Sequence, residues 1–215
     1  MSIKYNQYWR KSGLKGKWGD IYLQRLNIHK PKNFLEIGVF CGVTALNTCN
    51  LLSKINNDKF SYTGIDLFGK DKNININEAE PDFLKDQNFS NPLKNLYYNL
   101  ILKEKLNSIE SVSKLLRKYK NNVNLIQGNT NKVLKKINLS KFDFTFVDGG
   151  HSYLTVKSDL DILFKNLKGK RAILLCDDYG EESFIPEVKK AIDDFANINN
   201  LKINLIENRF AEITT

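Results

Sequence analysis

Two kinds of hydrophobic pattern alternate along this chain of 215 residues. Short runs of branched and aromatic residues, typical of buried strands, occupy residues 33–37, 60–66, 123–126, 142–148 and 172–176. Between them, apolar residues recur every three or four positions, which is typical of amphipathic helices. Two such stripes are regular: Leu93, Leu96, Tyr97, Leu100 and Ile101, and Val156, Leu160, Leu163, Phe164 and Leu167. We expect each stripe to cover a face of a sheet.

The alternation of strands and helices predicts an α/β fold. Right-handed βαβ crossovers would give a mainly parallel central sheet with helices on both faces. In such sheets, ligands bind at the carboxyl ends of the strands. No internal repeat and no linker rich in serine and glycine divides the chain, so we assign residues 31–215 to one domain.

Two segments lie outside this alternation. Residues 1–30 begin with large aromatic side chains placed among glycines, including Tyr5, Trp9 and Trp18. We expect this N-terminal segment to act as a lid or as an interface, for example in a homo-oligomer. Residues 69–92 form a long polar connection where a short one is usual, and we interpret them as a second candidate lid.

Composition narrows the class of protein. No apolar run approaches the roughly 18 residues of a membrane-spanning helix, and the first residues lack the apolar stretch of a signal peptide. We therefore expect a soluble, cytoplasmic protein with no membrane partner. Cys41, Cys49 and Cys176 are too few and too irregularly spaced for a disulfide framework or a zinc site, so we interpret them as reduced core residues.

The chain is basic, with 33 Lys and Arg against 24 Asp and Glu and a formal net charge of +9. Such an excess can indicate a nucleic-acid partner. The lysines are spread along the sequence, however, and a surplus of Asn, Lys and Ile is what an AT-rich genome produces. A nucleic-acid partner is therefore disfavoured but stays open as an alternative.

The first strand ends in a glycine turn that leads into a helix. Glu36 is followed by Gly38 and Gly42, and Thr44 stands in the first turn of the helix. Glycines permit a tight turn and the close approach of a ligand, while the first amides of a helix offer donors to an anion. The dinucleotide fingerprint needs a glycine where Phe40 stands, which argues against a nicotinamide cofactor. The alternative is an ordinary strand-to-helix turn.

The next two strands end in polar residues. Asp66 closes the second strand, where an acid in Rossmann-like folds accepts hydrogen bonds from ribose hydroxyls. Asn129 follows the third strand, where its amide could read an adenine edge. A solvated capping aspartate and a plain turn are the alternatives for these two residues.

Acids also follow the last two strands of the pattern. Asp148 and His151 come after residues 142–147, and Asp177 and Asp178 come after residues 172–176. If the two strands are parallel neighbours, three carboxylates and an imidazole meet at one end of the sheet. Three carboxylates repel one another, so we predict an oxygen-preferring divalent cation, Mg²⁺ or Mn²⁺ rather than zinc. Capping aspartates and a structural histidine are the alternatives.

The assembled residues resemble a class I S-adenosylmethionine (SAM) methyltransferase, and within that class the macrocin O-methyltransferase type, which acts on sugars and other small molecules. The likeness runs from about Asn33 to Phe195 and is carried by residues 142–153 (FDFTFVDGGHSY), residues 156–160 (VKSDL), Asp177-Asp178-Tyr179 and residues 186–192 (PEVKKAI). It implies the Rossmann-like class I methyltransferase fold.

The resemblance also implies roles for individual residues. Glu36, Gly38 and Gly42, with Thr44 beside them, would line the methionine end of SAM, and Asp66 would hold the ribose, with Asn129 near the base. Asp148, Asp177 and Asp178 would bind Mg²⁺ or Mn²⁺, with Asp148 and His151 in catalysis and His151 as the general base.

We therefore expect a SAM-dependent O-methyltransferase whose acceptor is a small molecule, a sugar or a nucleotide sugar. The cation would lower the pKa of the acceptor hydroxyl, and His151 would take its proton. Two alternatives remain at this point. One is an RNA methyltransferase or RNA binder, which the net charge favours, and the other is a methyltransferase that works without metal.

Overall fold

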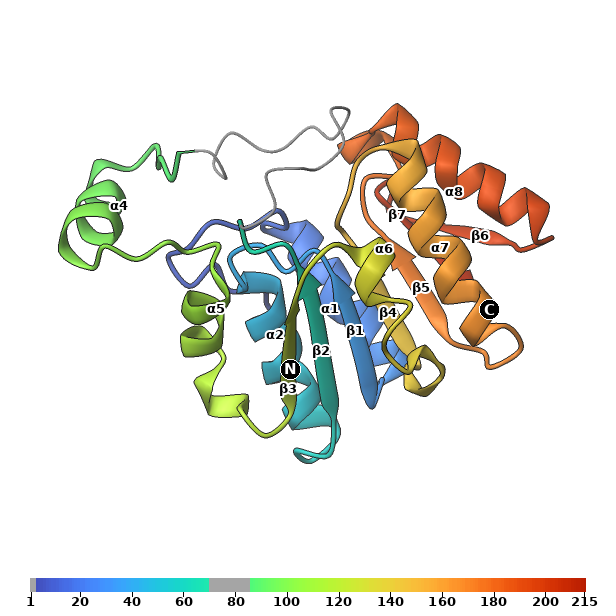
Figure 1. The fold of residues 1–215 in the computed structure, drawn as a ribbon, viewed down its shortest axis with the longest axis horizontal. Helices are drawn as coiled ribbons and strands as arrows, with labels where there is room; N and C mark the ends of the chain where they lie inside the picture. The colour runs from blue at the N-terminus through green and yellow to red at the C-terminus, as the bar shows by residue number, and fades with distance from the viewer. Residues whose placement is uncertain (1–2, 70–85) are drawn as a thin grey trace.

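A seven-stranded sheet forms the centre of the molecule (Figure 1). The structure is a computed structural model that describes residues 3–69 and 86–215. The strand order is β3-β2-β1-β4-β5-β7-β6. The strands are β1 (Asn33–Ile37), β2 (Ser61–Asp66), β3 (Val123–Gln127), β4 (Phe144–Val147), β5 (Ile173–Cys176), β6 (Ile203–Ile206) and β7 (Phe210–Thr214).

The first five strands are parallel, as the sequence predicts, and β6 and β7 add an antiparallel hairpin at one edge. The order reverses between β1 and β4, because β2 and β3 continue on one side of β1 and β5 follows β4 on the other. The carboxyl ends of β1 and β4 therefore form the topological switch point, where α/β sheets bind ligands. The α/β Rossmann-like fold class is confirmed.

Helices cover both faces of the sheet (Figure 1). One hydrophobic cluster packs α1 and α2 against it, and a second packs α7 and α8 against the opposite face. The helices are α1 (Lys17–His29), α2 (Val43–Ile55), α4 (Pro92–Asn95), α5 (Ile109–Leu115), α6 (Thr130–Val133), α7 (Tyr153–Leu167) and α8 (Pro186–Ile198), with a π-helical turn η1 (Leu96–Ile101) and the 3₁₀ turns η2 (Arg117–Tyr119), η3 (Leu139–Lys141) and η4 (Glu181–Ser183).

The central strands are mostly apolar because both of their faces are covered. All four residues of β4 are buried, with Phe144 and Phe146 on the side of α1 and α2 and Val147 on the side of α7 and α8. This is why β4 carries no charged residue, and its one polar residue, Thr145, is buried with the rest. Cys41, Cys49 and Cys176 are buried free thiols, as expected.

One of the two predicted stripes covers the sheet, and the other does not. All five members of the α7 stripe, from Val156 to Leu167, are buried. The stripe from Leu93 to Ile101 lies in α4 and η1, which form an arm at the left of Figure 1, away from the sheet. Leu93 and Leu100 are each 66% exposed. The expectation was wrong because this short arm packs through Tyr98, which lies outside the stripe and contacts the cluster of Cys41, Phe89 and Leu106.

Most of the candidate lid at residues 69–92, namely residues 70–85, lies outside the described residues. Within residues 3–69 and 86–215, no helix has the length and hydrophobicity that crossing a membrane requires.

Candidate active site

The turns after β1 and β4 interlock at the switch point. Gly38 has φ +88°, and a Cβ atom there would lie 1.9 Å from the carbonyl oxygen of Asp148. The Asp148 amide donates to the carbonyl of Ile37 at 2.9 Å, and the Gly38 amide donates to that of Ile65 at 2.9 Å. Only glycine fits at position 38, so the glycine turn is held directly beside the first acid.

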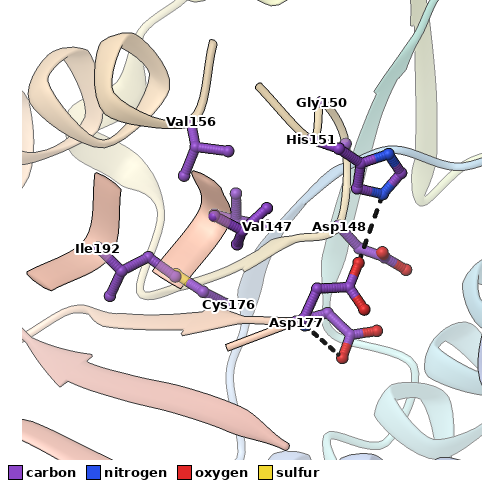
Figure 2. Close-up of a pocket in the computed structure, with 11 residues that line it drawn as sticks. Val147, Asp148, Gly150, His151, Val156, Cys176, Asp177 and Ile192 are labelled. Atoms are coloured by element: carbon purple, nitrogen blue, oxygen red, sulfur yellow. Dashed lines mark hydrogen bonds and ion pairs between the residues drawn. The ribbon is translucent and has the colours of Figure 1, made fainter. Parts of the chain in front are cut away.

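Three carboxylates meet beside this turn (Figure 2). Asp148 follows β4, and Asp177 and Asp178 follow its parallel neighbour β5, in which Cys176 pairs with Val147. One oxygen of each carboxylate lies within 4.8 Å of one oxygen of the other two. Asp177 is buried, and the other two are half-buried. The structure thus brings together the three predicted metal ligands.

The cluster is electrostatically crowded. Burial raises the pKa of Asp148 well above its ordinary range, and the charges of Asp177 and Asp178 raise it further. Burial also raises the pKa of Asp177, although hydrogen bonds from Arg209 work in the opposite direction. Crowded carboxylates of this kind favour binding of a cation, because a cation relieves their mutual repulsion.

His151 lies above the acids at the start of α7. Its Nε2 is 3.4 Å from Oδ2 of Asp178, and Figure 2 shows the ring above the carboxylates. The side chain is 27% exposed, so it can reach a molecule bound over the cluster. Gly149 and Gly150 connect it to Asp148, and Ser152 caps α7 by accepting from the amide of Thr155.

Glu36 lies in the centre of β1 and is completely buried. Its Oε2 accepts a hydrogen bond from the Tyr62 hydroxyl at 2.5 Å, whereas Oε1 has no hydrogen-bond partner among the described residues. Burial raises the pKa of Glu36 to about 8. A buried acceptor without a donor can take a hydrogen bond from a ligand that enters the turn.

Asp66 holds the glycine turn itself. Its Oδ2 accepts from the amides of Val39 and Phe40, both at 2.8 Å, and its Oδ1 accepts from the amide of Phe68 at 2.7 Å. A carboxylate offers about four lone pairs, so about one remains for a ligand. Burial raises the pKa of Asp66, and these amides work against that rise.

Asn129 stands next to Asp66, because the Gly128 amide donates to the Asp66 carbonyl at 2.9 Å. Its side-chain oxygen accepts from the Asn131 amide at 2.9 Å and caps α6. The side-chain oxygen of Asn129 thus has the capping role that a plain turn predicts. Its amide nitrogen retains two N–H donors for other contacts.

The N-terminal residues reach the same turn. The Tyr5 hydroxyl lies 2.8 Å from the hydroxyls of both Ser12 and Thr44. A Cβ atom on Gly13 would lie 3.8 Å from Oδ2 of Asp148. We call residues 3–16 the N-terminal strap. Buried hydrogen bonds between the hydroxyls of the strap and the Thr44 hydroxyl hold the strap to α2. The backbone of the strap passes beside Asp148, the first acid of the cluster.

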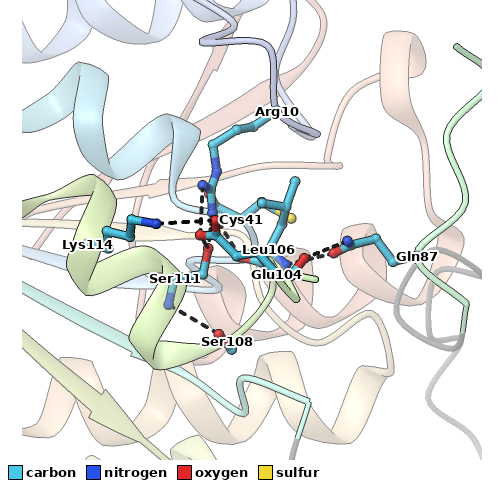
Figure 3. A network of polar contacts seen from close by, with 8 residues as sticks. All are labelled: Arg10, Cys41, Gln87, Glu104, Leu106, Ser108, Ser111 and Lys114. Carbon is cyan, nitrogen blue, oxygen red and sulfur yellow. Dashed lines mark hydrogen bonds and ion pairs between the residues drawn. The ribbon is translucent and has the colours of Figure 1, made fainter. Parts of the chain in front are cut away.

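A second contact anchors the strap through Arg10, a residue that the sequence analysis did not single out (Figure 3). Arg10 is buried and donates from Nε to the carbonyl of Cys41 at 3.0 Å. Its Nη2 donates to the carbonyl of Leu106 at 3.1 Å and to the Ser111 hydroxyl at 2.7 Å, and Glu104 lies 3.8 Å from Nη1. The strap is thereby fixed to the glycine turn and to α5.

Residues 35–179 match a family model described as a methyltransferase domain. No curated protein matches the sequence.

Several solved structures share the fold. One is the O-methyltransferase NovP, at 16% identity over 93% of this chain and 81% of that chain, with a TM-score of 0.60. Another is an O-methyltransferase from Bacillus cereus in complex with SAH, at 12% identity over 97% and 84%, with a TM-score of 0.58. A third is the SAH-bound methyltransferase PaMTH1 from Podospora anserina, at 18% identity over 93% and 79%, with a TM-score of 0.56.

Proposed function

The chain belongs to the methyltransferase domain family, and from this premise we propose that it transfers a methyl group from SAM to a hydroxyl oxygen of a sugar or another small metabolite. The observation that carries the proposal is the meeting of Asp148, Asp177, Asp178 and His151 beside the glycine turn. This is the arrangement that the macrocin O-methyltransferase type would require. SAH in two structures of the same fold supports SAM as the donor.

The residues of the turn fit such a donor. The SAM ammonium group can supply the hydrogen bond that Oε1 of Glu36 lacks. The remaining lone pair of Asp66 can accept from one ribose hydroxyl, while its other lone pairs keep the turn closed around the donor. The amide nitrogen of Asn129, one turn away, is available to an adenine edge.

The three aspartates fit a hard divalent cation, since all of their donor atoms are carboxylate oxygens. Mg²⁺ or Mn²⁺ held there would lower the pKa of an acceptor hydroxyl placed over the cluster. Asp148 joins this site directly to the donor turn, because its backbone contacts Gly38. An acceptor over the aspartates would thus lie close to the methyl group.

His151 is the base in this proposal. If Nε2 carries the hydrogen and donates toward Asp178, 3.4 Å away, the basic lone pair is on Nδ1. Asp178 would then orient the ring, and Nδ1 would take the proton of the acceptor hydroxyl. Gly149 lets the link from Asp148 to this histidine pass close to β1, since a Cβ atom there would lie 2.8 Å from the Ile37 side chain.

The strap supplies the wall that faces the acceptor. Gly13 passes Asp148 without a side chain, which leaves space over the carboxylates. Tyr5 and Arg10, which precede Gly13, fix the strap to Thr44 and to the carbonyl of Cys41. We therefore assign the lid role of the N-terminal segment to residues 3–16, and we propose that the choice of acceptor is made there.

Calorimetry with S-adenosylhomocysteine, NAD and a short RNA tests the donor site and the competing classes together. We expect binding of S-adenosylhomocysteine alone. Binding of the RNA with a steep salt dependence would instead support the nucleic-acid alternative. A protein that binds none of the three would overturn the proposal.

Methyl transfer to a panel of sugars and sugar nucleotides then tests the chemistry. EDTA should abolish transfer and Mg²⁺ should restore it, whereas full activity in EDTA would favour the metal-independent alternative. His151→Ala should lower turnover about 10²–10⁴-fold while binding of S-adenosylhomocysteine is retained. His29 is the second of the two histidines and belongs to an ion-pair cluster with Glu212, so His29→Ala is the matched control.

A further inference from the structure

Arg209 reaches the acid cluster from the β6–β7 hairpin at the edge of the sheet. It is the last of the three residues between β6 and β7, and the two before it, Glu207 and Asn208, have φ +49° and +55°. The Arg209 amide donates to the Ile206 carbonyl at 3.0 Å, which closes the turn. The hairpin therefore presents this arginine at a fixed place.

The hairpin is also attached to the segment that follows the acids. The amides of Tyr179 and Gly180 donate to the Arg209 carbonyl at 3.1 and 2.9 Å. A Cβ atom at position 180 would lie 2.1 Å from the Asn208 carbonyl oxygen, so the two chains touch directly. The backbone of Arg209 is thus fixed relative to the acids two and three residues upstream of Gly180.

The guanidinium group of Arg209 binds both carboxylate oxygens of Asp177. Nε donates to Oδ1 at 2.7 Å, and Nη2 donates to Oδ2 at 2.6 Å. The side chains of Arg209 and Asp177 are 11% and 2% exposed. The indole of Trp18, in α1, lies 5.6 Å from the guanidinium carbon and contributes a cation–π contact. A bidentate pair fixes both the position and the plane of a carboxylate.

This arrangement limits what Asp177 can offer to a ligand. Oδ1 also accepts from the Asp178 amide at 2.9 Å, so three of the roughly four lone pairs of the carboxylate are used. The remaining one is on Oδ2. With one arginine charge among three carboxylates, the cluster carries two negative charges when all three are ionised, which matches one divalent cation.

We propose that Arg209 is a positioning residue that holds Asp177 so that its last lone pair faces the cation. This inference rests on the proposed function, and in particular on the cation at the three aspartates. It makes a prediction opposite to that of simple electrostatics. Removing a nearby positive charge alone would strengthen cation binding, whereas removing the group that orients a ligand weakens it.

Titration of the whole 215-residue chain with Mn²⁺, followed by electron paramagnetic resonance of the free ion, measures the affinity for the cation directly. We expect Arg209→Met to bind Mn²⁺ about 10–100-fold more weakly than the parent. Arg209→Lys should restore only part of that affinity, because a lysine keeps the charge but not the two-point contact. Arg25→Met is the matched control, since Arg25 makes an equivalent bidentate pair with Glu212 outside the cluster.

Binding of S-adenosylhomocysteine and the circular dichroism spectrum verify that each variant folds. If Arg209→Met does not fold, Arg209→Lys decides, and it must bind Mn²⁺ more weakly than the parent. Equal or tighter binding by a folded Arg209 variant would overturn the proposal while the metal site stands. A parent that binds no Mn²⁺ would overturn the metal site itself, and this inference with it.

Discussion

Glu36 gives the most direct test of the electrostatics of the central sheet. Its side chain has no solvent exposure, and burial raises its pKa from 4.5 to about 8, although the hydrogen bond from Tyr62 lowers it in part. In the unfolded chain the same carboxyl ionises near its ordinary pKa. Replacing Glu36 with glutamine removes this titration and keeps a side chain of similar size and an oxygen that can accept from Tyr62.

The direction of the pH dependence follows from the number of protons that the folded and unfolded states bind. Between about pH 4.5 and 8 the folded protein holds a proton on Glu36 that the unfolded chain has lost, so the free energy of unfolding falls as the pH rises. Each unit of pKa difference is worth 1.36 kcal/mol. The shift of Glu36 therefore corresponds to about 4–5 kcal/mol, on the order of the whole stability of a small domain.

The assay is urea unfolding of the parent and Glu36→Gln between pH 5 and pH 9, without ligands. We expect similar stability at pH 5, and we expect the variant to gain on the parent as the pH rises, by about 4–5 kcal/mol at pH 9. Parallel curves for the two proteins would refute the reasoning, because they would mean that Glu36 titrates alike in the folded and unfolded states.

Glu212→Gln is a control with the opposite sign. Burial acts to raise the pKa of Glu212, but its ion pair with Arg25 and its contact with His29 outweigh burial and lower it. The stability that Glu212 contributes is present above its unfolded pKa and is lost as the pH falls through the folded pKa. Glu212→Gln should therefore be less stable than the parent at pH 7 and should converge with it in acid.

Two further outcomes follow from packing, and both are measured by urea unfolding. Gly180→Ala should cost about 1–3 kcal/mol, because its Cβ would meet the Asn208 backbone at 2.1 Å. A cost no larger than that of Gly13→Ala, whose Cβ would meet no atom closer than 3.8 Å, would contradict the contact. Leu160→Ala should cost about 2–5 kcal/mol, while Leu100→Ala, at a 66% exposed position, should stay within about 0.5 kcal/mol; equal costs would mean that the arm is packed.

The sheet was predictable because its signal is local. The five parallel strands appear as five short runs rich in branched and aromatic residues, because four of them are mostly buried and β3, at the edge, is half-buried. The chain order of strands and helices then limits the topology. For the same reason Asp148 and Asp177 could be placed together, although they are far apart in the sequence. Both follow strands whose neighbourhood the pattern indicates.

The hairpin and the arm show where such reasoning fails. β6 has two exposed residues among its four, Asn204 and Leu205, so its pattern is too weak to be recognised as a strand. The stripe from Leu93 to Ile101 has a regular helical period and yet lies outside the core. Periodicity describes the sides of a helix, but it does not say which side finds a partner.

The site residues that were missed share a chemical signature. Among 33 basic residues the chain has only five arginines, and Arg10, Arg25 and Arg209 each bind a carboxylate or buried carbonyls within the fold. The described lysines, by contrast, are all exposed or half-buried. A guanidinium keeps its charge when buried and satisfies two acceptors at once, whereas an ammonium loses far more hydration. Two of the five arginines, Arg117 and Arg171, are exposed like most lysines, so arginine identity alone does not select Arg209. It reduces the candidate partners of the three aspartates from 33 basic residues to five, and the hairpin then places Arg209 beside them.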